Sequence, residues 1–405
     1  MEPIKFKTVS FRTGTYVYVE EQTDSAAFYI VRQGSLIEES PLNNLTQESN
    51  LIIKTGDFFG VLDCMSRRAR LSSIRALEDT VLIVVRFDQF ETLITQMAPV
   101  AIKIIRYFSQ RLRKYNTTLA QLTQGATSKI ESNTLSSLIK LGEYYQSLGQ
   151  NNIAGYAFSN FIKNYPHDSS ILEVQNYLKI LNYDEKSHLP IQQGIQETYE
   201  AGNPIFLEYE QGADLYIILE GFIKITKFTN NQIVLLAMLK EKDIFGEMAI
   251  LENSPRSASA IAVTKVTLLR INKQNFELYI RTHPEIARRI IQLLSDRIWL
   301  IYKRLANQLI IDPITKIYDA LQTLLLNNRV PIKKGLAYSF EMSPTDIIQF
   351  IGLDPIIGKK YIDHIIANDS VLSVENNKLM SKDVYNIRSA IALSNRHQHR
   401  SAIKD

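Results

Sequence analysis

Hydrophobic and polar positions along the chain follow two patterns: short apolar segments typical of strands, and a repeat of three to four residues typical of helices. Short segments rich in Ile, Val, Leu, Phe and Thr, separated by Gly or Asn, predict strands at about ten-residue spacing. In the second half of the chain these strands cover residues 215–219, 222–228, 233–239 and 258–271. From Pro284 to Ile310 the apolar positions recur every three or four residues, which predicts one long amphipathic helix. We therefore expect a rolled sheet or barrel followed by a long helix.

This succession occurs twice in the chain. The stretch from Phe59 through Arg70 to Ser109 aligns without a gap with a second stretch 186 residues later, which contains Arg256. Residues 28–34 match residues 215–221 at an offset of 187, and a slip of one residue inside a loop is ordinary. The chain is therefore predicted to hold two copies of one domain, at residues 3–125 and 190–310.

Residues 130–185, between the copies, have a helical pattern of another kind. The apolar and small residues there resemble a tetratricopeptide repeat, in which a small residue lets two antiparallel helices approach and Pro ends the second helix. The matching positions are Leu138, Leu141, Gly142, Tyr145, Ala154, Phe158, Phe161 and Pro166. A lone repeat cannot bury its own faces, so we expect it to stack on its neighbours, including residues 171–181. It is interpreted either as a spacer or as a site for a protein partner.

Composition narrows the class of protein. Of 405 residues, 45% are apolar and 22% charged, which is typical of a globular protein and excludes bulk disorder. No apolar run is long enough to span a bilayer and no signal peptide is evident, so a cytoplasmic protein is expected. One cysteine excludes a disulfide framework and a cysteine-built zinc site, and no metal is expected. A net charge of +4 is compatible with nucleic acid without requiring it.

The second copy carries the most informative motif, Phe-Gly-Glu-Met-Ala-Ile-Leu from residue 245, followed by Ser-Pro-Arg-Ser-Ala from residue 254. It resembles the phosphate-binding cassette of cyclic nucleotide-binding domains, and the copy with its long helix is similar to the sensor half of Crp/Fnr regulators. A planar guanidinium and backbone amides at a helix N-terminus suit a cyclic phosphate, and a carboxylate suits the ribose 2′-hydroxyl. The resemblance assigns the ribose to Gly246, Glu247, Met248 and Ala249, and the phosphate to Arg256 and Ser257.

The resemblance extends to the long helix, where Arg297 matches a position that reaches toward the ligand. In cyclic AMP-responsive members of the Crp/Fnr family, small hydroxyl residues of this helix contact the adenine, but this chain has Ile301 and Tyr302 at those positions. Tyr302 is interpreted as a residue that stacks on the base or hydrogen-bonds to it. The ligand is therefore expected to be cyclic AMP or a related cyclic mono- or dinucleotide.

The first copy is predicted to be degenerate. Val61 stands where the second copy has Glu247, and Leu71 stands in place of Ser257, although Arg70 and Arg111 keep their charged positions. An apolar side chain cannot accept the ribose hydroxyl. The basic loop of Arg67, Arg68 and Arg70 is interpreted as structural or as a site for another anion. Nearby Cys64 is interpreted either as a buried apolar residue or as a redox-active thiol favoured by those arginines.

The C-terminal segment, residues 313–390, predicts helices over 314–326, 344–351 and 355–368 and a small hairpin over 371–380. Ser343, Pro344 and Asp346 form a helix start signal. The order resembles the winged helix-turn-helix of the Crp/Fnr family. Its recognition helix begins with the apolar residues 355–357, and Lys359 and Lys360 are the candidate DNA contacts, suited to phosphates. Residues 391–405 are expected to be a polar tail.

These predictions combine into an α+β multidomain protein with two jelly-roll-like β-rolls, each followed by a long helix, a helical hairpin between them and a C-terminal winged helix-turn-helix. The function expected is that of a cyclic nucleotide-responsive transcription regulator, with a homodimer formed through residues 284–310. The alternative is a nucleotide-sensing scaffold that binds protein without reading DNA sequence. No nucleophile-base set and no Walker-type loop is evident, so an enzyme is not expected.

Overall fold

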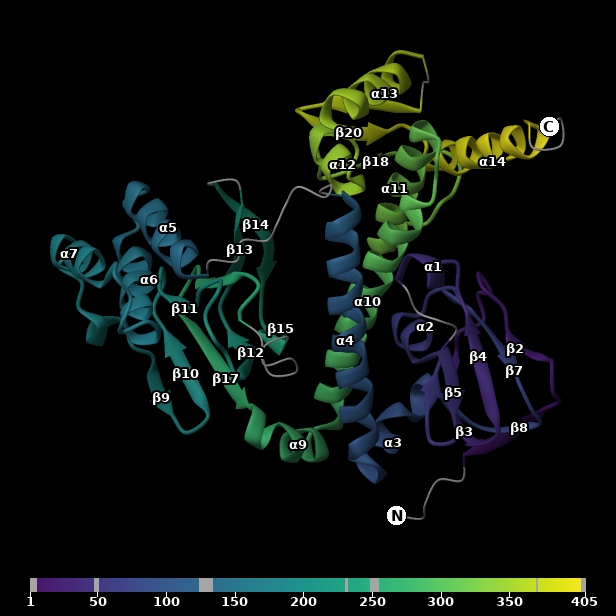
Figure 1. The fold of residues 1–405 in the computed structure, drawn as a ribbon, viewed down its shortest axis with the longest axis horizontal. Helices are drawn as coiled ribbons and strands as arrows, with labels where there is room; N and C mark the ends of the chain where they lie inside the picture. Colours follow the sequence, from purple (N-terminus) through teal and green to yellow (C-terminus); the bar gives the residue numbers. More distant parts are fainter. Residues whose placement is uncertain are drawn as a thin grey trace. The chain divides into compact units, whose positions relative to one another are not determined.

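A computed structural model describes residues 6–46, 51–123, 134–229, 232–247, 255–368 and 371–401. The chain divides into two units. One unit comprises Met1–Thr92, Gln110–Lys129 and Ile291–Asp405, and the other comprises Leu93–Ser109 and Ile130–Ile290. Each unit contains one rolled pair of antiparallel sheets, so the two rolls lie in different units (Figure 1).

The first roll, in the first unit, is built from β1 to β8 and two four-stranded sheets. One sheet has the order β1-β8-β3-β6 and the other the order β2-β7-β4-β5. The strands are β1 Lys7–Phe11, β2 Tyr16–Tyr18, β3 Ala27–Gln33, β4 Ser35–Glu39, β5 Leu51–Lys54, β6 Phe58–Phe59, β7 Ser73–Ala76 and β8 Thr80–Arg86. Two short helices accompany them, α1 Asn43–Thr46 and α2 Val61–Ser66. Alternate residues of these strands, among them Val31, Leu36 and Leu82, form the core between the sheets.

The second roll repeats this strand order in the other unit. Its sheets have the orders β15-β12-β17-β10-β9 and β11-β16-β13-β14, so only β9 at one edge lacks a counterpart in the first roll. The strands are β9 Ile191–Gln193, β10 Gln196–Tyr199, β11 Pro204–Phe206, β12 Asp214–Glu220, β13 Ile223–Thr229, β14 Gln232–Leu239, β15 Ile244–Phe245, β16 Ser259–Ala262 and β17 Val266–Asn272. Three of the four predicted strands match β12, β13 and β14. The predicted strand 258–271 is two strands, because the chain turns at residues 263–265 to pass from one sheet to the other.

A short and a long helix follow each roll, as the periodicity predicts for the long ones. They are α3 Phe90–Gln96 and α4 Ala98–Thr123 after the first roll, and α9 Lys273–Thr282 and α10 Pro284–Gln308 after the second. The part of α10 in the first unit buries its apolar side chains within the chain, including Leu294, Ile298 and Leu305. This part of the helix therefore offers no exposed apolar stripe to a second copy, and the homodimer through residues 284–310 stays a prediction.

The helical segment between the copies consists of α5 Thr134–Ser147, α6 Asn151–Asn164 and α7 Ile171–Leu181, followed by the 3₁₀ turn η2 Glu185–His188. A Cβ at Gly142 of α5 would lie 2.5 Å from the Phe158 ring of α6, so a small residue does allow these helices to approach. The Phe158 ring also stacks on Tyr177 of α7 at 4.9 Å. The three helices cover one side of the second roll, where Leu207 and Ile261 join their core (Figure 1). The tetratricopeptide assignment itself stays a prediction.

The C-terminal segment contains α11 Pro313–Asn327, α12 Pro344–Ile351, α13 Pro355–Asn368 and α14 Val384–Ser401, with a three-stranded antiparallel sheet in the order β18-β20-β19. The strands are β18 Tyr338–Ser339, β19 Leu372–Glu375 and β20 Lys378–Ser381. Ser343 and Asp346 form the predicted capping box at the start of α12. Residues 391–401, which we predicted as a polar tail, continue α14, because the helix that starts at Val384 and packs Ile387 into this core is not interrupted there.

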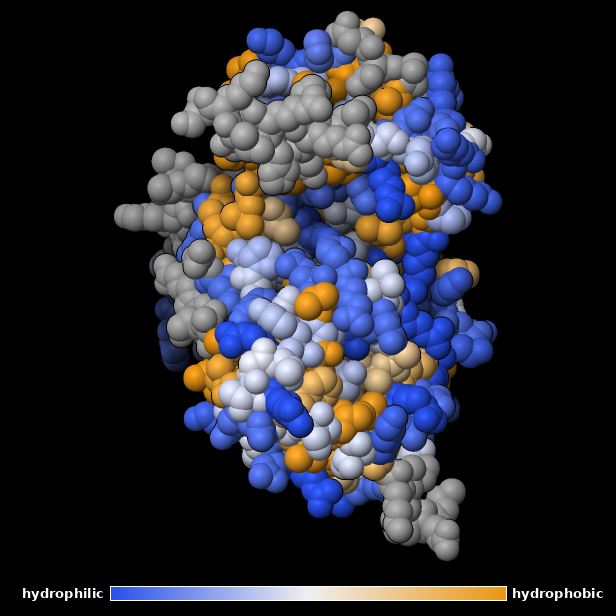
Figure 2. Space-filling model, turned by 90° about the vertical axis from the view of Figure 1, so that its right-hand side faces the viewer, coloured by the Kyte–Doolittle hydropathy of each residue, from blue (hydrophilic) through white to orange (hydrophobic). Residues whose placement is uncertain are grey.

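The surface contains both hydrophobic and hydrophilic residues. On the face that Figure 2 shows, hydrophobic residues occur in small groups among hydrophilic ones. Within the described part of the chain, no helix combines the length and hydropathy that a bilayer span requires.

Candidate ligand-binding site

The predicted phosphate-binding cassette lies at the end of β15 in the second roll. Gly246 follows this strand with a φ of 77°, a conformation that favours glycine. A Cβ at Gly246 would lie 2.7 Å from Nη1 of Arg256, so glycine is also required by close packing. Glu247 is buried beside it. Met248 and Ala249, which were also assigned to the ligand, lie outside the described residues.

Arg256 is held inside the roll. Its side chain is only 6% exposed, and Nη1 donates a hydrogen bond of 2.8 Å to the carbonyl oxygen of Gly246. Its guanidinium lies over the Phe206 ring, 4.0 Å from the ring centre, and burial lowers the pKa of the arginine. A Cβ at Gly212 would lie 2.4 Å from Nε of Arg256, so the loop before β12 can close over the guanidinium only with glycine there.

The charge of Arg256 is not balanced by a direct partner in the described residues. Its Nε has no hydrogen-bond partner among them, and no carboxylate among them forms an ion pair with it. Glu210, Asp214 and Glu247 favour its charged form from a longer distance, but a buried cation is stabilised most by a direct, hydrogen-bonded partner. The arrangement therefore suits an anion that enters beside the cassette.

Three aromatic rings form the floor beneath Arg256. Phe206 of β11 lies 6.0 Å from Tyr216 of β12 and 5.8 Å from Phe245 of β15, and Tyr216 stacks on Phe245 at 5.3 Å. These distances are those of favourable aromatic pairs. The rings come from three strands, so the floor fixes the arginine relative to both sheets.

Glu210 is a neighbour of the site that the sequence reasoning missed. Its backbone carbonyl accepts a 2.7 Å hydrogen bond from the Arg256 amide. Its carboxylate accepts hydrogen bonds from Asn160 and Tyr156 of α6, at 2.8 and 3.3 Å, and from the Leu207 amide at 2.8 Å. Burial raises the pKa of Glu210 to about 7. The helical segment thus contacts the residue that holds the backbone of Arg256.

The remaining predicted site residues lie elsewhere. Ser257 is exposed. Arg297, also exposed, and Tyr302 belong to the unit that contains the first roll. The Tyr302 hydroxyl donates a hydrogen bond of 2.6 Å to the carbonyl oxygen of Leu71 and lies 3.0 Å from the Ser40 hydroxyl. In this structure Tyr302 is therefore buried against the first roll, and its role as a ligand contact stays a prediction.

The first roll has the same arginine in the same place. Arg70 is 2% exposed, donates hydrogen bonds to the carbonyl oxygens of Gly60 at 3.2 Å and Ala27 at 2.8 Å, and lies over the Tyr18 ring at 4.2 Å. Here the guanidinium does have a counter-charge, since Oδ2 of the buried Asp63 lies 3.7 Å from its Nη1. Asp63 occupies the position that corresponds to Ala249 at the 186-residue offset.

The other residues around Arg70 differ from those of the second cassette. Val61 and Leu71 are buried and apolar, as the substitutions at the ribose and phosphate positions predict. Arg111 of α4 donates a hydrogen bond of 3.1 Å to Glu38 of β4, so it too is satisfied within the unit. Cys64 is completely buried, and burial raises the pKa of its thiol to about 12, which favours its interpretation as a core residue over a redox-active one.

Comparison with known proteins identifies both rolls. Residues 8–97 and 196–283 each match the family described as the cyclic nucleotide-binding domain. The chain contains two cyclic nucleotide-binding domains. No group of three His, Cys, Asp or Glu residues that could hold a metal ion occurs in the described ranges.

The relatives are regulators. A CRP-like cAMP-activated global transcriptional regulator of Mycobacterium tuberculosis is 28% identical over 157 residues, which cover 38% of this chain and 69% of that protein. The cyclic AMP receptor protein of Thermus thermophilus is 34% identical over 101 residues, covering 25% of this chain and 47% of the receptor. A cAMP-dependent protein kinase regulatory subunit of Neurospora crassa is 33% identical over 120 residues, covering 30% of each chain. The chain is thus homologous to CRP/FNR-type regulators, which confirms that part of the sequence interpretation.

Proposed function

We propose that this protein is a cyclic nucleotide-responsive transcription regulator, in which the second roll binds the nucleotide and the C-terminal segment binds DNA as a winged helix-turn-helix. The observation that carries the ligand assignment is the state of Arg256. It is buried beside Gly246 and Glu247 without an ion-pair partner among the described residues, whereas the equivalent Arg70 pairs with Asp63. A cyclic phosphate supplies the direct ion-pair partner that Arg256 lacks among these residues. The relatives that respond to cyclic AMP favour this nucleotide as the ligand.

Isothermal titration calorimetry with cyclic AMP, cyclic GMP and cyclic di-GMP tests the ligand assignment. Arg256→Ala removes the guanidinium that meets the phosphate, and we expect affinity for the preferred nucleotide to fall by about 100-fold or more. Arg70→Ala is the matched control and leaves that affinity unchanged, because Arg70 already has its counter-charge. Equal affinities of the wild type and the Arg256→Ala variant would contradict the assignment.

The C-terminal segment supports DNA binding by its geometry. Gly352, with a φ of 68°, makes the turn between α12 and α13, and a Cβ at Gly358 would lie 2.6 Å from Ile348, so the two helices pack closely. The Asp354 carboxylate caps α13 by accepting hydrogen bonds of 3.0 Å from the amides of the next two non-proline residues. Lys359 and Lys360 are exposed on α13, where they are available to phosphates.

A salt titration separates DNA binding from the scaffold alternative. We expect a duplex of random sequence to bind more tightly when the nucleotide is present, with an affinity that falls as salt rises. The double variant Lys359→Ala/Lys360→Ala reduces the slope of log affinity against log salt by about two. If no salt-dependent binding occurs with or without nucleotide, the scaffold alternative stands instead.

The exposed start of α13 indicates what such a helix reads. Ile356 is 83% exposed and Ile357 50% exposed, and neither can hydrogen-bond to a base edge. Apolar side chains in the major groove contact the C5-methyl group of thymine. Selection from a random duplex library is therefore expected to enrich thymine, and replacing thymine by uracil in the selected site weakens binding by about fourfold for each lost methyl contact. A protein partner that covers these isoleucines would be insensitive to this replacement.

A further inference from the structure

The first roll contains a second arginine with a largely buried side chain, and it contacts other elements than Arg70 does. Arg68 follows the C-terminal end of α2, and its side chain is 8% exposed. At the 186-residue offset the second copy has Ser254, which is too short to make the same contacts. This arginine is therefore a feature of the first roll alone.

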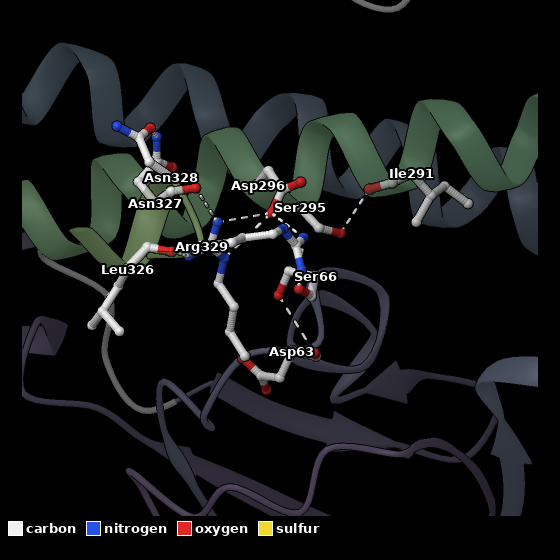
Figure 3. A network of polar contacts seen from close by, with 10 residues as sticks. Asp63, Ser66, Ile291, Ser295, Asp296, Leu326, Asn327, Asn328 and Arg329 are labelled. Atoms are coloured by element: carbon white, nitrogen blue, oxygen red, sulfur yellow. Dashed lines mark hydrogen bonds and ion pairs between the residues drawn. The ribbon is translucent and has the colours of Figure 1, made fainter. Parts of the chain in front are cut away.

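The guanidinium of Arg68 bridges two helices that follow the second roll in sequence. Its Nε and Nη2 lie 3.3 and 3.2 Å from Oδ1 of Asp296 in α10. Its Nη1 and Nη2 donate hydrogen bonds of 2.7 and 3.3 Å to the carbonyl oxygens of Leu326 and Asn327 at the end of α11 (Figure 3). The guanidinium also lies over the ring of Trp299, 3.9 Å from its centre.

The carbonyl oxygens at the end of α11 are well suited to accept hydrogen bonds from a cation. The last carbonyl groups of a helix have no partner within the helix, and they form the negative end of its dipole. Arg329, just beyond α11, bonds back to the first roll: its Nη2 donates a 3.3 Å hydrogen bond to the carbonyl oxygen of Ser66. The same Nη2 lies 3.6 Å from Asp296. The contact is thus reciprocal, with an arginine from each side (Figure 3).

Two further contacts fix α10 on the same roll one to two turns later. Tyr302 bonds to Leu71, as described above, and Nζ of Lys303 lies 2.9 Å from Oε1 of Glu21. Asp296, Trp299, Tyr302 and Lys303 of α10 therefore all contact the first roll. Downstream, α11 shares one hydrophobic core with α12 and α13.

We propose that the first roll is a docking domain for this chain's own α10 and α11, with Arg68 as the residue that positions the C-terminal segment. In this role the roll does not need a nucleotide, and its occupant is a segment of the same chain. A rearrangement of α10 that moves α11 must break or shift the contacts of Arg68. The proposal concerns contacts within one unit and does not depend on the proposed function.

The chain contains one tryptophan, Trp299, which is 3% exposed and covered by Arg68. Its fluorescence therefore reports directly on the contact between Arg68 and α10 in the full-length protein. In Arg68→Ala we expect a red-shifted emission and increased acrylamide quenching, together with about tenfold faster hydrogen exchange in peptides covering residues 324–330. Arg67→Ala is the matched control, because this neighbouring arginine is exposed and lies over Phe87 of the roll instead; we expect neither change.

Asp296→Asn tests the same contact from the α10 side and leaves the sequence of the roll intact. It removes the charge that pairs with Arg68, and we expect faster exchange at residues 324–330 while β3 and β8 stay protected. A double variant, Arg68→Ala/Asp296→Asn, then adds less than the sum of the single effects. Unchanged exchange at residues 324–330 in both single variants would overturn the proposal. So would a loss of protection in β3 and β8 with Arg68→Ala while Asp296→Asn has no effect, since Arg68 would then serve only the stability of the roll.

Discussion

The two rolls hold their arginine by two shared contacts and differ in whether a carboxylate pairs with it directly. In each, the guanidinium donates to the carbonyl oxygen of the cassette glycine and lies over an aromatic ring, and in each its Nε has no hydrogen-bond partner among the described residues. Even the floors agree: the ring of Tyr29 stacks on Phe59 at 5.2 Å, as Tyr216 stacks on Phe245 at 5.3 Å. Among the described residues, Arg70 has a direct ion-pair partner in Asp63, whereas Glu210, Asp214 and Glu247 act on Arg256 without forming an ion pair with it.

This difference shows that a cassette arginine does not by itself indicate a ligand. Its bond to the glycine carbonyl and its ring contact hold the roll together in both copies, so the arginine is required for packing even where no ligand is expected. What distinguishes the copies is a built-in anion. In the first roll, Asp63 pairs with the arginine, which is the role that we assign to a phosphate in the second, and the neighbouring Leu71 contacts α10 through Tyr302.

Replacing each arginine by alanine is expected to give the largest loss of stability, and the loss differs between the two rolls. Arg70→Ala leaves the buried Asp63 without its partner, and we expect a loss of about 3–5 kcal/mol in the unfolding free energy of the first roll. Arg256→Ala removes a hydrogen bond from a charged donor but strands no paired carboxylate, so we expect about 1.5–3 kcal/mol for the second roll. Hydrogen exchange of β3 and β8 against β12 and β17 measures the two separately. A larger loss in the second roll would contradict the view that Asp63 is the internal counter-charge.

The pH dependence of the first roll tests Asp63 directly. Burial raises the pKa of this carboxyl to about 6, while the unfolded chain has an ordinary value near about 4. The native state therefore binds the proton more tightly, so this contribution to stability is fully present below about pH 4 and is lost as the pH rises through about 6. A shift of about two units corresponds to about 3 kcal/mol. Asp63→Asn, which cannot ionise, lacks this dependence.

Urea unfolding followed by Trp299 fluorescence measures that difference. We expect the unfolding free energy of the wild type, minus that of Asp63→Asn, to decrease between pH 4 and pH 6.5. Subtracting the variant removes the contribution of other titrating groups in the same unit. A difference that is flat, or that rises with pH, would show that Asp63 is not shielded from water in the way the structure indicates.

Much of the fold follows from the sequence because its signals are local or repeated. The capping box of Ser343 and Asp346 and the 3.6-residue period of α10 act within one or two turns, and both are confirmed. The repeat offset predicts that the two rolls have one strand order, which the sheets confirm. The turn at residues 263–265 was missed because apolar residues flank it on both sides, so no break in the pattern indicates a change of sheet.

The roles of Asp63, Arg68 and Tyr302 could not be predicted in the same way. The offset alignment does show Asp63 opposite Ala249, but only the fold brings its carboxylate to Arg70. Tyr302 was assigned to the second roll because the alignment treats each long helix as part of its own copy. The hydroxyl instead bonds to Leu71, more than 200 residues earlier. Such pairings depend on how the helix packs, and no periodicity in the sequence contains that information.

Tyr302→Phe is expected to have the smallest effect. It tests whether the Tyr302 hydroxyl stabilises the first roll or contacts a ligand of the second. It keeps the ring beside Tyr115 and removes only the hydroxyl, which bonds to the Leu71 carbonyl and lies next to the Ser40 hydroxyl. We expect a loss of about 1 kcal/mol in the unfolding free energy reported by Trp299, and no change in nucleotide affinity. If Tyr302 instead contacts a nucleotide held by the second roll, calorimetry shows weaker binding in this variant. A lowered affinity without a loss of stability would therefore return Tyr302 to the ligand site predicted from the sequence.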